Sequence, residues 1–388
     1  MLSEIKYFPV NWVDGMKISS TDFISAENAV LDTIRDSRSL FLHAFNYGLL
    51  PSNHPEIDNY PYLSYDYLSN QLVLKECRAI TPAGYRIEIT ENSFNRNKYP
   101  AVQPSASLPA AEPGFYDVYI YVDPSQRVGA GDFASNTPPR HLHVAPAYEL
   151  AIRPHDEHYI EQGNFLKISE IEVKDGRVEI YSASGRYIPA STSMSAHATL
   201  AELHRNYLER CHAVIKHHAD LVGRMGVDTW NEVAQEALGL MEKIVLPLIA
   251  SINYYQNIVF NLPPVVCISY LKDFAAIVKF HLNKPLKGEL INDYKPELIS
   301  AINDLERLEP IQGALMNSFE RITPIFTELE IFFNKLSKYN YNNQSFTLYD
   351  HNQLTASGPK PIIMPDRLQA EPATPPDKSE VAGSERLF

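Results

Sequence analysis

The spacing of apolar residues changes near Ile188-Pro189, and this change divides the sequence into two patterns. Before it, short apolar runs alternate with polar residues and are bounded by turn residues, as in β-strands. After it, apolar residues recur every three or four positions almost to Tyr339, as in α-helices. The pattern predicts an α+β multidomain protein, with an N-terminal antiparallel β-sandwich or barrel over residues 1–190 and an all-α helical bundle over residues 191–339.

The β-rich part is expected to begin with an amphipathic helix. This helix would start at Thr21 or Asp22, where a short polar side chain can cap the free amides, and would end before Gly48. The apolar residues on one of its sides are Phe23, Val30, Leu31 and Ile34. Strands are then predicted at 72–78, 85–90, 115–122, 166–173 and 177–187. Two proline-rich connections, 99–113 and 138–146, are predicted to run over the surface or to contact partners, which makes them candidate docking loops.

The second part begins with a stripe of residues at helical spacing. Its members are Leu200, Leu203, Tyr207, Cys211, Val214, His218 and Leu221. Further helices are expected from Asp228, with a kink at Pro247, over 265–282 and over 298–333. Residues 340–388 offer too little apolar surface to offset the entropy of ordering, so they are predicted to be a flexible, proline-rich tail or a peptide that folds on a partner.

Composition excludes several classes of protein. The 388 residues carry a formal net charge of −13, which would repel nucleic acid and anionic lipid. The start of the chain lacks the pattern of a secretory signal, and the longest apolar run, residues 244–250, is too short to span a bilayer. We therefore expect a cytosolic protein that neither binds nucleic acid nor inserts into a membrane. Cys77, Cys211 and Cys267 are far apart and are predicted to be buried thiols.

The strongest metal candidate is the pair His141 and His143 with Glu149. Two histidines at alternate positions of a strand point to one face, and a carboxylate could complete a site. The segment is flanked by prolines and offers no fourth ligand, so solvated side chains are the alternative interpretation. A cupin-like metalloenzyme is the function that this pair would support.

The other clusters of titratable residues favour structural explanations. The run His155-Asp156-Glu157-His158 indicates a charged surface turn, and Glu170 and Glu172 would lie on alternate positions of a strand. His212, His217 and His218 fall in the first long helix. The sequence contains no GxSxG, GxGxxG, Walker A or HExxH motif. No catalytic residue, cofactor or metal ligand is therefore predicted.

Short motifs in a fixed order resemble one known family. Trp12 and Gly15 form a W-x-x-G-hydrophobic motif ahead of Phe23 and a helix, and a Pro-Ala-Gly turn at 82–84 and an Ile-Pro junction at 188–189 follow. This order resembles TssK, a baseplate subunit of the bacterial type VI secretion system. Residues 19–23 depart from the family's Pro-Gln-His-Phe stretch, and the chain ends soon after the bundle. The resemblance thus implies a divergent, short form that lacks the usual C-terminal head domain.

The resemblance implies a structural function and no catalysis. A protein of this family would be a homotrimer that binds other baseplate subunits and, through its C-terminal part, the membrane-anchoring complex, so it would be cytoplasmic and located at the baseplate docked on the inner membrane. The candidates for partner binding are Trp12, Gly15, Met16, Ile18 and Phe23. Heptad spacing does not fix oligomer number, so the trimer or bundle packing candidates are Leu200, Leu203, Tyr207, Val214 and Leu221.

One further alternative rests on the many tyrosines. Tyrosine offers a large, rigid surface with a polar tip, which suits protein interfaces and carbohydrate stacking alike. A phage-like receptor-binding or carbohydrate-binding protein would share the predicted β domain. Binding to a glycan without affinity for secretion subunits would favour that alternative.

Overall fold

The computed structural model describes residues 4–52, 60–89, 104–108, 113–135, 138–155, 163–225, 232–285 and 289–339. One compact unit runs from Met1 to Leu348 and a second from Tyr349 to Phe388. Every described residue belongs to the first unit. The predicted flexible tail, residues 340–388, lies outside the described residues.

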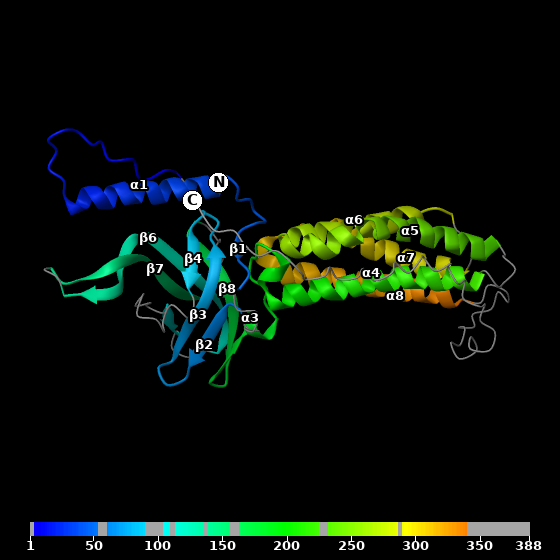
Figure 1. Cartoon of the computed structure of the whole chain (residues 1–388). Coiled ribbons are helices and arrows are strands. Elements are labelled where there is room, and N and C mark those ends of the chain that lie inside the picture. Colours follow the sequence, from blue (N-terminus) through cyan, green and yellow to red (C-terminus); the bar gives the residue numbers. More distant parts are fainter. Residues whose placement is uncertain are drawn as a thin grey trace, which may run out of the picture. The chain divides into compact units, whose positions relative to one another are not determined.

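The N-terminal half contains one long helix and two antiparallel sheets (Figure 1). Its elements are α1 (Ser20–Ser39), β1 (Gly48–Leu49), β2 (Tyr62–Asp66), β3 (Gln71–Ile80), β4 (Arg86–Ile89), β5 (Ser105–Ser107), β6 (Gly114–Ala134), β7 (Arg140–Pro154), β8 (Phe165–Lys174) and β9 (Arg177–Ile180). In the first sheet β3 pairs with β1, β2, β4 and β5, and the second sheet has the order β7-β6-β8-β9. Apolar residues of both sheets, such as Leu72, Leu74, Val118 and Ile120, belong to one buried cluster.

The C-terminal half is helical. Its elements are α3 (Tyr181–Ser184), the 3-10 turn η1 (Met194–Ala196), α4 (Ala198–Met225), α5 (Glu232–Asn257), η2 (Val259–Asn261), α6 (Pro264–Leu282), α7 (Glu289–Glu306), η3 (Gln312–Ala314) and α8 (Leu315–Lys338). Helix α4 lies against α5 and α8, and α6 and α7 pack with the same group. Their apolar sides form a second buried cluster. The described residues thus combine antiparallel sheets with helices, most of which follow the strands, and this agrees with the predicted α+β class.

Several predicted boundaries were wrong, each for a local reason. Helix α1 starts at Ser20 because Ser19 is its N-cap; the Asp22 carboxylate accepts hydrogen bonds from the Ser19 N–H at 2.8 Å and from its Oγ at 2.7 Å. The strand predicted over 177–187 ends at Ile180, where a single helical turn begins; this turn ends at Gly185, whose φ of 75° suits glycine.

The predicted surface loop at 138–146 was also wrong, because residues 140–146 are the first half of β7. Pro146 fits there since β7 is the last strand on its side of the sheet, and an edge strand tolerates a residue without an N–H. Most of the other loop, 99–113, lies outside the described residues, but 105–107 form β5.

The two halves are joined by backbone contacts between β1 and the residues after the Ile188-Pro189 junction. The Leu49 N–H donates to the Ala190 carbonyl at 2.7 Å, and the Thr192 N–H donates to the Leu49 carbonyl at 2.8 Å. Gln312, which is buried, adds hydrogen bonds from its Nε2 to the carbonyls of Phe45 (3.0 Å) and Ser191 (2.5 Å). These bonds join main-chain groups of two segments, 45–49 and 190–192, and the Gln312 side chain of a third, so they fix the start of the helical half against the first sheet.

Candidate interaction surface

Residues 4–18 contain no helix or strand and are held by two buried side chains of α1. The Asp32 Oδ2 atom accepts hydrogen bonds from the N–H groups of Lys6 at 2.5 Å and Tyr7 at 3.1 Å. The Arg35 Nη2 atom donates to the Glu4 carbonyl at 3.1 Å. The segment is thus fixed through its backbone, which leaves its side chains available for other contacts.

Asp32 and Arg35 also bind each other. The distance from Arg35 Nε to Asp32 Oδ1 is 2.7 Å. Arg35 is only 2% exposed and Asp32 only 4% exposed. Burial by itself raises the pKa of the Asp32 carboxyl, but the hydrogen bonds from Lys6 and Tyr7 and the Arg35 guanidinium outweigh it and hold this pKa below its ordinary value. The charged side of α1 therefore faces inward.

The apolar side of α1 faces outward as a result. Phe23 is 59% exposed and Val30 is 58% exposed, and Ile24, Leu31 and Ile34 are exposed as well. In the N-terminal segment Phe8, Trp12, Val13 and Ile18 are also exposed. We call these nine residues the N-terminal surface. Isolated exposed apolar residues are common in proteins, but a group of them on neighbouring segments is typical of a binding site for another protein.

The five candidates for partner binding all lie in or beside this surface. The Trp12 and Phe23 rings are neighbours, with centroids 6.3 Å apart and planes inclined at 50°. Gly15 has a φ of 79° in the turn that the Met16 N–H closes by donating to the Val13 carbonyl at 3.2 Å. Ile18 is exposed and Met16 is half-buried. The turn between Trp12 and Ile18 thus lets both of them belong to the same surface as the start of α1.

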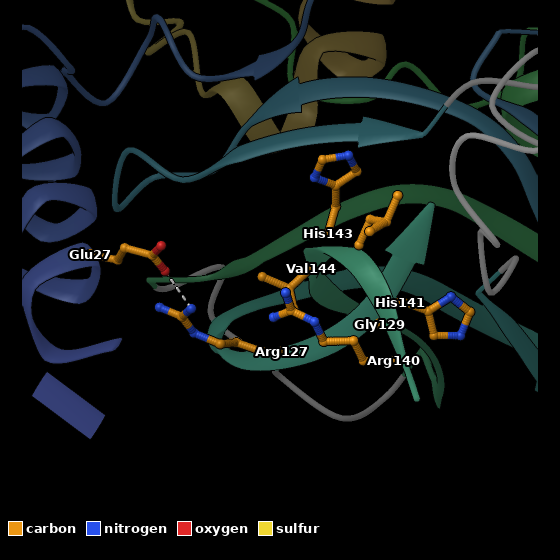
Figure 2. Close-up of a pocket in the computed structure, with 8 residues that line it drawn as sticks. Glu27, Arg127, Gly129, Arg140, His141, His143 and Val144 are labelled. Carbon is orange, nitrogen blue, oxygen red and sulfur yellow. Dashed lines mark hydrogen bonds and ion pairs between the residues drawn. The ribbon is translucent and has the colours of Figure 1, made fainter. Parts of the chain in front are cut away.

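Beside α1 lies a pocket of about 560 Å³, bounded on its other side by strands β6 and β7 (Figure 2). Its lining residues are Glu27, Arg127, Gly129, Arg140, His141, Leu142, His143 and Val144. Arg127 joins the two sides, since its Nη1 lies 2.5 Å from Glu27 Oε2 and its Nη2 donates to Asn28 Oδ1 at 2.9 Å. The contact fixes this part of the strands against the helix.

The structure does not bring the His141, His143 and Glu149 side chains together as metal ligands. In Figure 2 the two imidazoles extend in different directions. Within the described residues these three do not form a group whose ligand atoms lie within coordinating reach of one another. The geometry gives no support to the cupin-like alternative.

One group of possible metal ligands does lie close together, although these residues were not grouped with one another in the sequence analysis. It consists of Asp117, His155 and Glu170. The Lys167 ammonium lies between two of them, 2.8 Å from Asp117 Oδ1 and 2.9 Å from Glu170 Oε1. A positive charge therefore already lies beside the position where a metal ion would bind, and the group is an ion-pair network that joins β6 and β8, the two central strands of the second sheet.

The remaining chemical candidates have structural surroundings. The Tyr181 hydroxyl donates to the Glu172 carboxylate at 2.7 Å, and Asp156, Glu157 and His158 lie outside the described residues. Burial lowers the pKa of His217, and His212 and His218 lie on the same helix α4. The three cysteines are buried, as predicted, and burial raises the pKa of each thiol to about 12, so they stay protonated at neutral pH.

The candidates for trimer or bundle packing lie inside the chain's own helical core. Leu200, Tyr207, Val214 and Leu221 are buried, and Leu203 packs against the same cluster. The Tyr207 hydroxyl is 2.7 Å from Thr323 Oγ1 of α8. None of the described helices has both the length and the apolar character that crossing a bilayer requires.

Comparison with known proteins gives a likeness in structure alone. No protein-family model matches the sequence, and no curated protein matches it either. Among solved structures, the baseplate complex from the type VI secretion system matches with a TM-score of 0.53 and 13% identity, over 84% of this chain and 99% of that chain. A crystal structure of TssK matches with a TM-score of 0.51 and 13% identity, over 84% of this chain and 72% of that chain.

These matches extend over most of the chain, including the sheets and the helices that follow them. At 13% identity they establish the fold and leave the binding partners to be tested. The resemblance found in the sequence motifs is thus matched by the arrangement of the elements: the chain is TssK-like in fold.

Proposed function

We propose that this chain is a structural subunit of a type VI secretion baseplate and that it acts by binding other baseplate subunits. The TssK-like fold supports the class of machine. The observation that carries the mode of action is the orientation of α1, whose polar residues Asp32 and Arg35 are buried while its apolar residues are exposed. Exposing an apolar helix face to water is unfavourable in free energy, and burial of that face against a partner would remove this penalty.

The N-terminal surface is proposed as the site that binds the baseplate partner. Burying an aromatic side chain such as Phe23 or Trp12 contributes strongly to protein association, and aromatic residues are enriched at the centres of interfaces. The buried Asp32–Arg35 pair holds this surface in place before binding, which reduces the entropy lost when a partner docks. No side chain of the surface needs to do chemistry.

The finer parts of the proposal come from the resemblance of the sequence motifs to TssK. The β-sandwich half would form a shell that docks on baseplate subunits, and the helical half and the C-terminal segment would face the membrane-anchoring complex. The protein would thus be a homotrimeric adaptor located at the baseplate. The separate buried clusters of the two halves support a division into two structural parts, and the partner of each part is the subject of the proposal.

The trimer predicts a solution mass three times the 43.9 kDa of one chain. Light scattering of the purified full chain at several concentrations measures this mass. If the mass equals that of one chain at all concentrations, the trimer is contradicted, whereas the binding proposal is unaffected.

The binding proposal predicts that Phe23→Glu and Trp12→Glu each weaken binding of other baseplate subunits by roughly a hundredfold, because a carboxylate cannot be buried in an apolar interface without a partner. Both residues are exposed, so the variants should fold. Co-purification and surface binding with the other baseplate subunits of the same secretion system measure the loss.

The matched control is Leu68→Glu, since Leu68 is the most exposed large apolar side chain among the described residues and lies in the turn between β2 and β3. It should bind as the unaltered chain does. Equal binding by all four proteins would refute the N-terminal surface as the docking site, and glycan binding without affinity for baseplate subunits would refute the function.

A further inference from the structure

The outer parts of β6 and β7 form a two-stranded ribbon, here defined as residues 127–134 and 140–146. They pair antiparallel from Arg127↔Pro146 to Ala134↔Arg140. Strand β8 pairs with β6 only from Gly114 to Tyr121, so in the described part of the chain no third strand extends along the ribbon. The edge of a sheet presents backbone N–H and C=O groups that can pair with an added strand.

The ribbon is held rigidly at its base. A register shift between Asp123 and Arg127 directs it away from the rest of the sheet, and the Arg127 contacts with Glu27 and Asn28 fasten it to α1. A strand fixed in this way loses little conformational entropy when another strand joins it.

The pocket of Figure 2 is lined by residues of both strands of the ribbon and by Glu27 of α1, so it lies between the ribbon and the helix. Five consecutive residues of β7, from Arg140 to Val144, line it. Because Arg127 and Gly129 of β6 line it as well, the pocket borders both strands of the ribbon, and β7 is the one whose outer edge has no partner strand anywhere along its length among the described residues.

The chemistry of the edge indicates what kind of segment fits. Leu142 and Val144 alternate with polar residues and are exposed, as is Phe133 on the facing strand. The charged groups of the pocket are two arginines and Glu27, and Glu27 is already paired with Arg127. Arg140 thus leaves a net positive charge in a chain whose net charge is −13. This positive charge favours an acidic segment as the occupant of the edge.

We propose that the β7 edge of the ribbon binds an extended, acidic segment of another protein by strand addition. Backbone pairing along residues 140–145 supplies affinity, alternate apolar residues of the segment contact Leu142 and Val144, and its carboxylates pair with Arg140. This surface is separate from the N-terminal surface, and the inference holds whether or not the partner belongs to a baseplate.

The test uses the full chain and a labelled ten-residue peptide of alternating Glu and Val. Fluorescence anisotropy at low salt should show saturable binding, and Arg140→Glu should weaken it at least tenfold. Hydrogen exchange should slow at outward-facing amides of residues 140–145 when the peptide is bound, because strand addition protects edge amides. A peptide of alternating Lys and Val should not bind.

Arg177→Glu is the matched control, since Arg177 is an exposed arginine on β9, the strand at the opposite edge of the same sheet. It should bind the acidic peptide as the unaltered chain does. The proposal is overturned if the acidic peptide fails to bind, if the basic peptide binds equally well, or if protection appears outside the ribbon. A solution mass that falls in Arg140→Glu would show that the edge pairs with a second copy instead.

Discussion

Replacing Gly48 with alanine is expected to destabilise the fold by more than about 4 kcal/mol, because the added methyl group has no space. A Cβ atom at Gly48 would lie 2.0 Å from the Ala190 carbonyl oxygen and 2.7 Å from the Ser191 nitrogen. Both are main-chain atoms, and the Ala190 carbonyl is held by the Leu49 N–H at 2.7 Å. The backbone at Gly48 also has a φ of 113°, which L-residues avoid. Soluble yield and urea unfolding measure the effect.

A control variant separates two contributions to the loss of stability, namely the steric clash of the added Cβ atom and the strain of a positive φ. Gly176 has a φ of 73° in the turn between β8 and β9, but a Cβ atom there meets no atom within 4 Å. Gly176→Ala should therefore cost only the conformational part, about 1–2 kcal/mol. If the two alanine variants had the same free energy of unfolding, β1 would not pack against Ala190 as described.

Asp32→Ala is the second change with a large expected effect. It leaves the Arg35 guanidinium buried without its carboxylate, and breaking a buried ion pair in this way costs about 3–5 kcal/mol. It also removes the acceptor of the Lys6 and Tyr7 amides, so the N-terminal segment should detach from α1 and its amides should exchange faster with solvent. Urea unfolding gives the free energy, and hydrogen exchange reports on the segment.

The stability that Asp32 supplies should depend on pH in one direction. Its pKa in the folded chain is lowered, so the carboxylate contributes fully above the ordinary carboxyl value of about 3.9 and this contribution is lost as the pH falls through the folded value. The difference between Asp32→Ala and the unaltered chain should be constant above about pH 4 and shrink below it.

Asp36→Ala is the matched control, since Asp36 also approaches Arg35 but at 3.9 Å and with its side chain 28% exposed. It should cost less than about 1 kcal/mol. An equal loss in the two variants, or no dependence of the Asp32 effect on acid, would show that the buried pair does not hold the N-terminal segment.

The sequence alone determined the class of fold and most of the elements. Alternation of apolar residues located β3, β4 and β8 to within two residues, and the helical period located the stripe of α4 and the extent of α6. These predictions succeed because the period at which side chains return to the same face is a local property of strands and helices. The burial of the three cysteines followed from their apolar character. The motif order led to the TssK-like fold that the structural matches share.

Only the tertiary structure decided which side of α1 faces solvent. The sequence shows an apolar side and a polar side, and the usual expectation buries the apolar one. Here Asp32 and Arg35 neutralise each other and bind the backbone of residues 4–7, so the polar side can be buried and the apolar side is left exposed.

The network of Asp117 with Lys167 and the contact of Arg127 with Glu27 were hidden from the sequence for a related reason. Their members are far apart along the chain, and no local period records which distant side chains a fold brings together. The same holds for Gly48, whose need to be glycine comes from the approach of Ala190, a residue of the other half of the chain. Local periodicity fixes the elements, whereas the packing of distant segments fixes which of their surfaces remain free to bind a partner.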